Sequence, residues 1–312
     1  MKVVVTGCCG FIGSHVCEFL LKRDDIVYGI DIMNDYYDPS QKEKNLNDLK
    51  KYNNFHFKQD DLVTTKIIDR VIPDVVVNLG AMAGVRYSLD KPEIYMKTNV
   101  EGQTHLLKRC IENKIKLFVY ASSSSVYGLN TKVPFSETDQ INNLVSPYAL
   151  SKKLGEEVAE LYHKLYGINV IGLRFFTVYG PRGRPDMAPY KFLNAIMKNE
   201  PIDKYGGGLS YRDYTYIDDI VVGIIGAIDN KCNKKCEIYN LGNSKPITLN
   251  EFIRTCEDVT GRPAIIRQQE EQKGDVPYTY ADIYKAQKDL NYQPNTKLYS
   301  GLQRMFMWLR DN

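Results

Sequence analysis

Three glycines near the start of the chain constrain its fold more than any other feature. Gly7, Gly10 and Gly13 stand three residues apart, directly after the apolar run 3–6. Residues 14–23 then carry apolar side chains at helical spacing, so the sequence predicts a strand, a tight turn and a helix in succession. Glycine allows such a turn and lets the backbone approach a pyrophosphate, whose charge the free N–H groups of a helix start can bind. The pattern therefore predicts a dinucleotide site.

An acidic residue closes the second predicted strand. Asp31 follows the apolar run 26–30 and lies eighteen positions beyond Gly13. At about this distance, a carboxylate accepts hydrogen bonds from the adenosine ribose and repels a 2′-phosphate. We therefore expect NAD, rather than NADP, as the cofactor.

A tyrosine and a lysine stand four residues apart further along the chain. Tyr148 and Lys152 share one face of the predicted helix 147–166, so the ammonium group can lie beside the phenol. A fixed neighbouring cation stabilises the phenolate and lowers the pKa of the tyrosine, which can then act as a general base. The same spacing occurs on ordinary amphipathic helices, and the glycine loop upstream is what favours the catalytic interpretation.

The composition is that of an ordinary globular protein and excludes several classes of partner. Of 312 residues, 43% are hydrophobic and 25% are charged, and the formal net charge is only +3, so we expect no nucleic-acid partner. No apolar stretch approaches the length of a membrane span, and Met1 leads directly into a predicted strand. We therefore expect a cytoplasmic protein with no membrane contact. The seven cysteines and four histidines lack metal-ligand spacing, so free thiols and no metal are expected.

Strands and helices alternate through most of the chain. This alternation predicts an α/β fold with a Rossmann-type, doubly wound parallel sheet, and the turn-rich sequence after residue 175 indicates a smaller C-terminal lobe. The predicted strands are 3–6, 26–30, 55–58, 75–79, 117–121, 170–175 and 237–241. The predicted helices are 14–23, 42–50, 66–71, 99–113, 147–166, 188–198, 217–228, 249–260 and 302–309.

Polar or small residues follow three of the predicted strands, in the segments 78–88, 122–127 and 176–180. Ligands of such sheets bind beyond the carboxyl ends of the strands, so these segments are candidates for the site. A serine hydroxyl in the second segment, near the oxygen of Tyr148, could share a proton with a reacting sugar hydroxyl. A polar exit from the strand explains the serine run equally well.

Taken together, these motifs resemble the extended short-chain dehydrogenase/reductase family. The matching residues are Gly7-x-x-Gly10-x-x-Gly13, Asp31, Asp61-Leu62, the serine run 122–125 and Tyr148-x-x-x-Lys152. Within this family the chain is most similar to the UDP-glucuronate 4-epimerases, through the segments 30–38, 83–88, 120–128, 174–181, 183–188 and 212–219. The resemblance covers essentially the whole chain. It implies NAD-dependent epimerisation of UDP-glucuronate to UDP-galacturonate at C4, through a transient 4-keto sugar.

The resemblance also implies roles for individual residues. Tyr148 is the implied base, Lys152 its electrostatic partner and a ligand of the nicotinamide ribose, and Ser123 the assisting hydroxyl. The implied NAD contacts are Gly7, Gly10, Phe11, Ile12, Gly13, Asp31, Asp61, Leu62, Leu79, Ala81, Asn99, Tyr148 and Lys152. The implied substrate contacts are Arg86, Ser124, Ser125, Thr177, Arg184, Arg212 and Asp275.

The family also implies a domain arrangement and an assembly. Residues 1–175 with about 215–242 are expected to form the NAD-binding domain, and residues 176–214 with 243–312 the nucleotide-sugar-binding lobe. A homodimer is implied, through a helix bundle that includes the helix 147–166.

A few positions discriminate among the reactions of the family. Sugar-nucleotide dehydratases typically carry Asp-Glu where this chain has Ser124 and Ser125, and UDP-glucuronate decarboxylases usually carry glutamate at the second position. Both reactions are therefore disfavoured. Thr177 stands where hexose epimerases commonly have asparagine, and glucuronate epimerases share both this threonine and an arginine at the position of Arg184. A hydroxyl and a guanidinium can bind the C6 carboxylate of glucuronate.

Three alternatives remain open from the sequence. The chain could be a 4-epimerase of UDP-N-acetylhexosamine or UDP-glucose, a UDP-glucuronate decarboxylase, or a non-catalytic NAD-binding sensor. Met82 and Tyr211 stand where the family commonly has glutamine and arginine, and both bear on which sugar is accepted. Sensors commonly lose the tyrosine or the lysine, whereas Tyr148 and Lys152 both persist.

Overall fold

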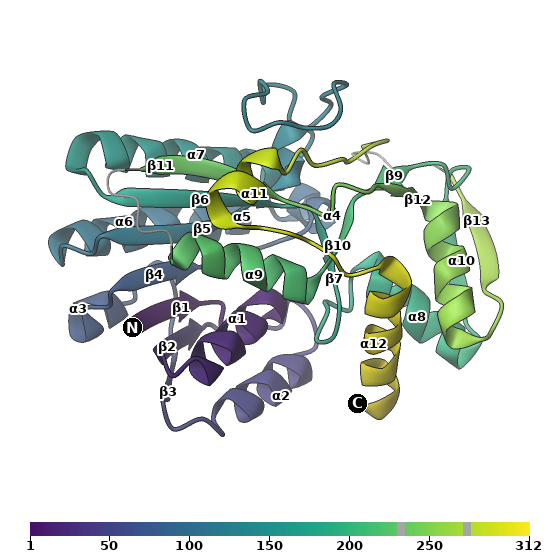
Figure 1. The fold of residues 1–312 in the computed structure, drawn as a ribbon, viewed down its shortest axis with the longest axis horizontal. Coiled ribbons are helices and arrows are strands. Elements are labelled where there is room, and N and C mark those ends of the chain that lie inside the picture. The colour runs from purple at the N-terminus through teal and green to yellow at the C-terminus, as the bar shows by residue number, and fades with distance from the viewer. Residues whose placement is uncertain (230–234, 271–275) are drawn as a thin grey trace.

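A parallel sheet forms the centre of the computed structural model, which describes residues 1–229, 235–270 and 276–312 (Figure 1). Within these residues, seven strands pair in parallel in the order β11-β6-β5-β4-β1-β2-β3. The connections reverse direction between β1 and β4, which is where ligands bind in such sheets. The strands are β1 (Lys2–Thr6), β2 (Ile26–Asp31), β3 (Phe55–Gln59), β4 (Val75–Asn78), β5 (Leu117–Ser123), β6 (Asn169–Phe175) and β11 (Cys236–Leu241).

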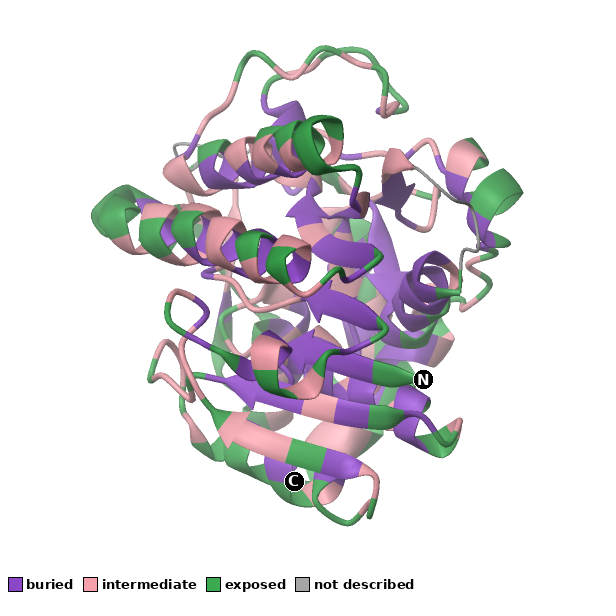
Figure 2. Ribbon diagram, turned by 90° about the vertical axis from the view of Figure 1, so that its left-hand side faces the viewer, coloured by how far each residue is buried: buried purple, intermediate pink, exposed green. Residues whose placement is uncertain are grey.

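Helices cover both faces of this sheet, as Figure 2 shows by the buried strands between them. Along β1, Val3 and Val5 join one hydrophobic cluster while Val4 joins another, because successive side chains of a strand point to opposite faces. One face is covered by α1 (Phe11–Lys22) and α9 (Ile217–Ile228), which pack on each other, with α2 (Ser40–Leu49) beside α1. The other is covered by α3 (Ile67–Val71), α6 (Gly102–Glu112) and α7 (Pro147–Tyr166). The predicted doubly wound fold is confirmed.

Several short elements bring the chain to the rim of the sheet. After β4 come α4 (Val85–Asp90), α5 (Pro92–Tyr95) and the π-helix η1 (Met96–Glu101), and a 3₁₀ turn, η2 (Ser124–Tyr127), follows β5. The predicted helix 99–113 is therefore α-helical only from Gly102, with a π-helix before it. Other ends shift by a few residues: α1 begins at Phe11, α2 at Ser40, and β2 reaches Asp31. The sequence did not predict α4, α5 or η2.

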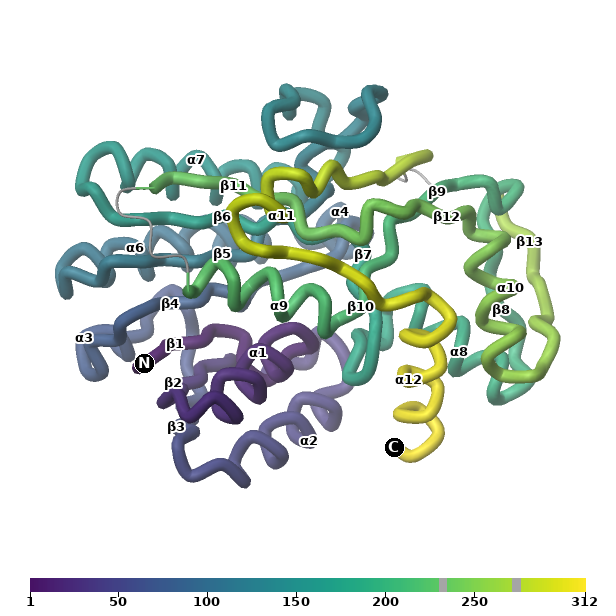
Figure 3. Tube along the Cα trace, viewed as in Figure 1, coloured from purple at the N-terminus to yellow at the C-terminus, as the bar shows by residue number. Residues whose placement is uncertain are grey.

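The rest of the chain forms a smaller lobe beside the sheet (Figure 3). Its described residues form three strand pairs and three long helices: β7 (Thr177–Tyr179) with β10 (Tyr214–Tyr216), β9 (Tyr211–Arg212) with β12 (Ile247–Thr248), β8 (Pro201–Tyr205) with β13 (Ile265–Gln269), and α8 (Ala188–Lys198), α10 (Leu249–Thr260) and α12 (Leu298–Asp311). The helix α11 (Tyr284–Leu290) returns to pack on β11 before α12 lies against α10. One hydrophobic cluster runs from the sheet into this lobe, so the two share a core.

None of the helices in the described ranges has both the length and the apolar character that crossing a bilayer requires.

Candidate active site

A cleft of about 2290 Å³ runs from the glycine loop, past the carboxyl ends of the central strands, to the lobe. Its walls include residues of the three strand-end segments that the sequence singled out. Every predicted site residue in the described part of the chain lines this cleft except Asn99. The predicted substrate contact Asp275 lies outside the described residues.

The glycine loop forms a cradle at one end of the cleft. Gly7 adopts a left-handed backbone conformation, with a φ of 65°, and its carbonyl accepts a hydrogen bond from the N–H of Gly10 at 3.0 Å. A Cβ atom on Gly13 would overlap that carbonyl, and one on Gly7 would lie 2.8 Å from the Cα of Gly80. Among the residues that the structure describes, no side chain caps the start of α1. The backbone N–H groups of this cradle therefore fit a pyrophosphate, which binds to such unpaired donors.

Asp31 lies at the end of β2, next to the cradle, with its side chain 6% exposed. Its carboxylate accepts hydrogen bonds from the backbone N–H of Cys9 at 3.2 Å and of Met33 at 2.9 Å. The ammonium of Lys42 lies 3.6 Å from Oδ1 of Asp31 and donates to the side chain of Asn34 at 2.7 Å. This corner suits the hydroxyls of an adenosine ribose. Sequence reasoning missed Lys42, because only the fold of α2 against β2 brings it to Asp31.

The tyrosine and the lysine lie at the start of α7, where the predicted helix begins. Ser146 caps the helix by accepting a hydrogen bond from the N–H of Ala149 at 3.1 Å, and Pro147 occupies its first turn. Tyr148 and Lys152 then face the cleft one turn apart. The Nζ of Lys152 lies 6.0 Å from the centre of the Tyr148 ring and donates to the carbonyl of Ala121 at 2.9 Å. The ammonium of Lys152 is thus bonded to β5 while it lies beside the Tyr148 ring.

Burial shifts the pKa values of both groups toward their neutral forms. It raises the pKa of Tyr148 above its ordinary value, although a hydrogen bond with Ser123 and the charge of Arg184 oppose the shift. Burial also lowers the pKa of Lys152 to about 8, against the opposing charge of Glu156. Both charged forms lose hydration in the cleft wall, and a partly neutral lysine near pH 8 follows from this.

A buried ion pair connects α7 to the strand β6. Arg174 on β6 donates from Nε and Nη2 to the two oxygens of Glu156, at 2.9 and 2.8 Å. The hydroxyl of Ser122 donates to the same carboxylate at 2.5 Å, and Nη1 of Arg174 donates to Tyr127 at 3.0 Å. These contacts tie α7 to β5 and β6, one helical turn beyond Lys152. Sequence reasoning missed this pair because its two members come from different elements.

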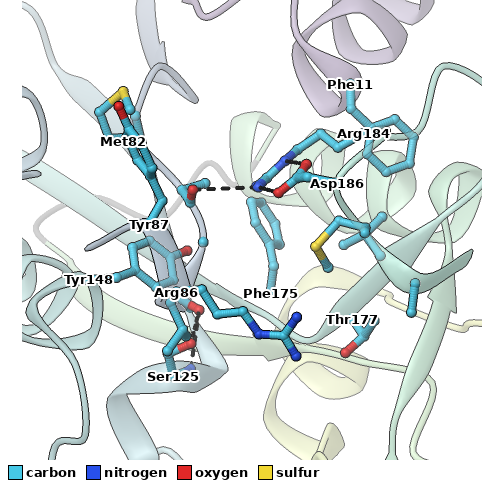
Figure 4. Close-up of a pocket in the computed structure, with 18 of the residues that line it drawn as sticks. Phe11, Met82, Arg86, Tyr87, Ser125, Tyr148, Phe175, Thr177, Arg184 and Asp186 are labelled. Carbon is cyan, nitrogen blue, oxygen red and sulfur yellow. Dashed lines mark hydrogen bonds and ion pairs between the residues drawn. The ribbon is translucent and has the colours of Figure 1, made fainter. Parts of the chain in front are cut away.

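Arg184 and Thr177 lie on the wall opposite Tyr148 (Figure 4). Arg184 donates to the carboxylate of Asp186 from Nε at 2.9 Å and from Nη2 at 2.5 Å. Arg86, from α4, places its guanidinium 5.1 Å from the centre of the Tyr205 ring, which belongs to the lobe. Basic side chains from both parts of the molecule thus face one cleft.

The predicted contact Asn99 lies behind the cleft wall rather than in it. Its side chain accepts a hydrogen bond from the N–H of Met82 at 2.8 Å and donates to the carbonyl of Met82 at 2.9 Å. It also donates to the hydroxyl of Ser151 at 2.9 Å. Asn99 therefore joins the loop after β4 to α7. Met82, one of the departures from the family pattern, is 6% exposed and lines the cleft.

The chain matches known proteins over almost its whole length. The family model described as GDP-mannose 4,6 dehydratase matches residues 4–305. UDP-glucuronate 4-epimerase 3 of Arabidopsis thaliana is 42% identical over 328 residues, which cover 98% of this chain and 76% of that protein. A UDP-glucuronate 4-epimerase of Thermodesulfobacterium geofontis is 40% identical over 314 residues, covering 99% and 96%.

A solved structure is also similar throughout. The UDP-glucuronic acid 4-epimerase from Bacillus cereus, in complex with UDP-glucuronic acid and NAD, superposes with a TM-score of 0.95 at 34% identity and covers 100% of this chain and 99% of that one. The resemblance that the motifs indicated is confirmed.

Proposed function

Because this chain belongs to the GDP-mannose 4,6-dehydratase family of extended short-chain dehydrogenases/reductases, we propose that it epimerises UDP-glucuronate to UDP-galacturonate at C4. One observation carries the proposal: a general-base candidate, Tyr148, and a cationic side chain, Arg184, face each other across a single cleft beside a pyrophosphate cradle. Burial raises the pKa of Tyr148, and the charge of Arg184 across the cleft opposes this rise. A sugar acid between them would have its reacting hydroxyl and its carboxylate bound at once.

NAD fits the residues at the sheet edge. The cradle of Gly7, Gly10 and Gly13 would hold the pyrophosphate, and Asp31, assisted by Lys42, the adenosine ribose. When bound, NAD supplies an acceptor that takes a hydride from the sugar and later returns it, so that no NAD is consumed. The solved Bacillus cereus epimerase was determined with NAD, which supports this assignment.

Tyr148 removes the proton from the O4 hydroxyl as that carbon is oxidised to a ketone. Ser123 hydrogen bonds to the phenol and stabilises its anion, because an acceptor that carries charge binds a donor more strongly. Lys152 supplies a positive charge one helical turn away. After the 4-keto sugar has turned its other face toward the cofactor, Tyr148 returns the proton to O4 and the configuration at C4 is inverted.

The C6 carboxylate makes the oxidised intermediate prone to a side reaction, the loss of carbon dioxide. Oxidation at C4 produces a β-keto acid, which can lose carbon dioxide before the hydride returns. Thr177 and Arg184 would anchor the carboxylate through a hydroxyl and a guanidinium, which holds it away from the alignment that its loss requires. Ser124 and Ser125 stand where dehydratases and decarboxylases carry carboxylates, so neither elimination nor decarboxylation has its acid or base here.

The diphosphate of the substrate needs cations, and Arg86 and Arg212 supply them at the same cleft. We assign residues 1–175 with 215–242 to the NAD-binding domain, and residues 176–214 with 243–312 to the nucleotide-sugar-binding lobe. The strands of the seven-stranded sheet all fall in the first set, which supports this division.

We further propose a cytoplasmic homodimer that pairs through α7. Leu161, Leu165 and Tyr166 on this helix are 51%, 61% and 56% exposed, which supports a partner surface there. The six described cysteines carry free thiols, as is usual in a reducing compartment.

NMR of the product mixture formed from UDP-glucuronate, without added cofactor, tests the proposed reaction. We expect UDP-galacturonate at equilibrium with the substrate, because NAD remains bound through each turnover. UDP-pentose as the main product, with UDP-galacturonate absent, would overturn the proposal. Parallel reactions with UDP-glucose and UDP-N-acetylglucosamine separate it from the hexose epimerases.

A further inference from the structure

The neighbours of Arg184 bind its guanidinium through Nε and Nη2. A guanidinium offers two donor edges, and here the Nε–Nη2 edge faces the two oxygens of Asp186, at 2.9 and 2.5 Å. The Arg184 side chain is 18% exposed and that of Asp186 36%. Nη1, at the other edge, makes no hydrogen bond to any residue in the described ranges. Nε and Nη2 are thus held, and Nη1 remains available to a ligand.

Tyr36, which belongs to the NAD-binding domain, contacts the same guanidinium. The guanidinium carbon of Arg184 lies 5.5 Å from the centre of the Tyr36 ring. Nη2 donates to the tyrosine hydroxyl and to the carbonyl of Ala83, both at 3.4 Å. That hydroxyl donates to the carbonyl of Ala83 at 2.7 Å. Gly84 allows this approach, because a Cβ there would lie 2.8 Å from the hydroxyl, and its φ is 104°. Three distant segments of the chain therefore meet at Arg184.

The negative charge of Asp186 indicates that it orients Arg184 and does not serve to strengthen substrate binding. A carboxylate beside Arg184 weakens the attraction of that arginine for an anionic substrate, since two negative groups then share one cation. A site built only for affinity would leave the arginine unpaired. The pairing with Asp186 instead fixes the plane of the guanidinium, because two parallel hydrogen bonds hold both Nε and Nη2.

We propose that Asp186 is a positioning residue, which orients Arg184 so that its Nη1 group binds the C6 carboxylate of the sugar and keeps the 4-keto acid from losing carbon dioxide. This inference rests on the proposed function. Asp186 acts through Arg184 and need not touch the substrate. The ring of Tyr36, over which the guanidinium lies, also restrains it.

The step that Asp186 suppresses is the decarboxylation of the 4-keto acid. Loss of carbon dioxide breaks the C5–C6 bond, and its electron pair moves through C5 to the oxygen of the C4 carbonyl. The resulting enolate takes a proton at C5 and becomes UDP-4-ketopentose. Reduction at C4 by the hydride removed in the first step then gives UDP-pentose. A carboxylate fixed near the plane of the C4 carbonyl cannot align the breaking bond with its π orbitals, whereas a freely turning one can.

Four variants of the holoenzyme test this role: D186A, R184A, the double variant, and D311N. The last is a matched control, because Asp311 also pairs with the Nε of a neighbouring arginine but lies at the exposed end of α12. Each variant is given UDP-glucuronate, and NMR measures UDP-galacturonate, UDP-4-ketopentose and UDP-pentose. Calorimetry measures the affinity for UDP, which lacks the sugar and so reports on the intact nucleotide site.

We expect D186A to raise the share of pentose products about tenfold and to lower kcat/KM for UDP-glucuronate about tenfold, as the loss of a charge-assisted hydrogen-bonded pair implies. Its affinity for UDP and all properties of D311N should stay at the wild-type level. In the R184A background, removing Asp186 should change the product ratio no further, since its effect passes through the arginine.

An unchanged product ratio in D186A, alongside a raised ratio in R184A, overturns the role of Asp186. So does an effect of D186A that persists in full in the R184A background, or a loss of UDP affinity equal to the loss of activity. Failure of the wild-type enzyme to form UDP-galacturonate would instead count against the proposed function itself.

Discussion

Replacing Lys152 by methionine should make the cofactor-free protein more stable at neutral pH. The lysine is almost fully buried, and burial lowers its pKa from an ordinary value of 10.5 to about 8. Folding therefore costs free energy wherever the unfolded chain still carries the proton. This cost is fully present below about pH 8 and disappears as the pH rises toward 10.5, because the lysine is then neutral in both states.

The magnitude follows from the size of the shift. A difference of about 2.5 pH units corresponds to about 3 kcal/mol of destabilisation at pH 7. Methionine has a similar length and no charge, but it leaves the carbonyl of Ala121 without its donor, which costs about 1 kcal/mol. We therefore expect the K152M variant to gain about 2 kcal/mol at pH 7 and to lose this advantage above pH 10.

Urea unfolding of both proteins at pH 7 and pH 10.5 measures this difference. The cofactor-free form is required, because bound NAD would add its own binding free energy to the wild type. Equal stability at pH 7, or a K152M advantage that does not shrink at high pH, would refute the electrostatic reasoning. The same variant should be nearly inactive, so the lysine is retained for chemistry at a cost in stability.

Three further predictions concern the cradle, the base and the buried pair. G13A should bind no NAD, measured by the absorbance of released cofactor, because the added Cβ overlaps the carbonyl of Gly7; retention of NAD would show that the loop can adjust. Y148F should keep its NAD and lose activity by about a thousandfold, as removal of a general base implies, and turnover near the wild-type rate would exclude the phenol as base. E156Q should lower the free energy of unfolding by about 3 kcal/mol, because the buried charge of Arg174 is left uncompensated. The further change R174M should restore part of that loss, and no recovery would count against the pair as its cause.

Local features of the sequence determined the class of the fold and the location of the site. The glycine spacing, the apolar strands and the helical periodicity each depend on residues near one another in the chain, so they could be predicted without tertiary contacts. The same holds for Tyr148 and Lys152, whose separation by one helical turn is a local property. Short elements such as β8 and β13 escaped prediction because each is paired through a partner more than 60 residues away.

Only the tertiary structure decided which side chains surround those groups. Tyr36 and Asp186 are separated by 150 residues and yet meet at Arg184, and Glu156 on α7 meets Arg174 on β6. It also gave the ammonium of Lys152, which lies beside the Tyr148 ring, a hydrogen bond to a backbone carbonyl of β5 that the sequence did not predict. Such contacts depend on how helices pack against the sheet, and burial there sets the charge states. The sequence by itself determined the kind of chemistry, and packing determined how each charged group is held and how far its pKa is shifted.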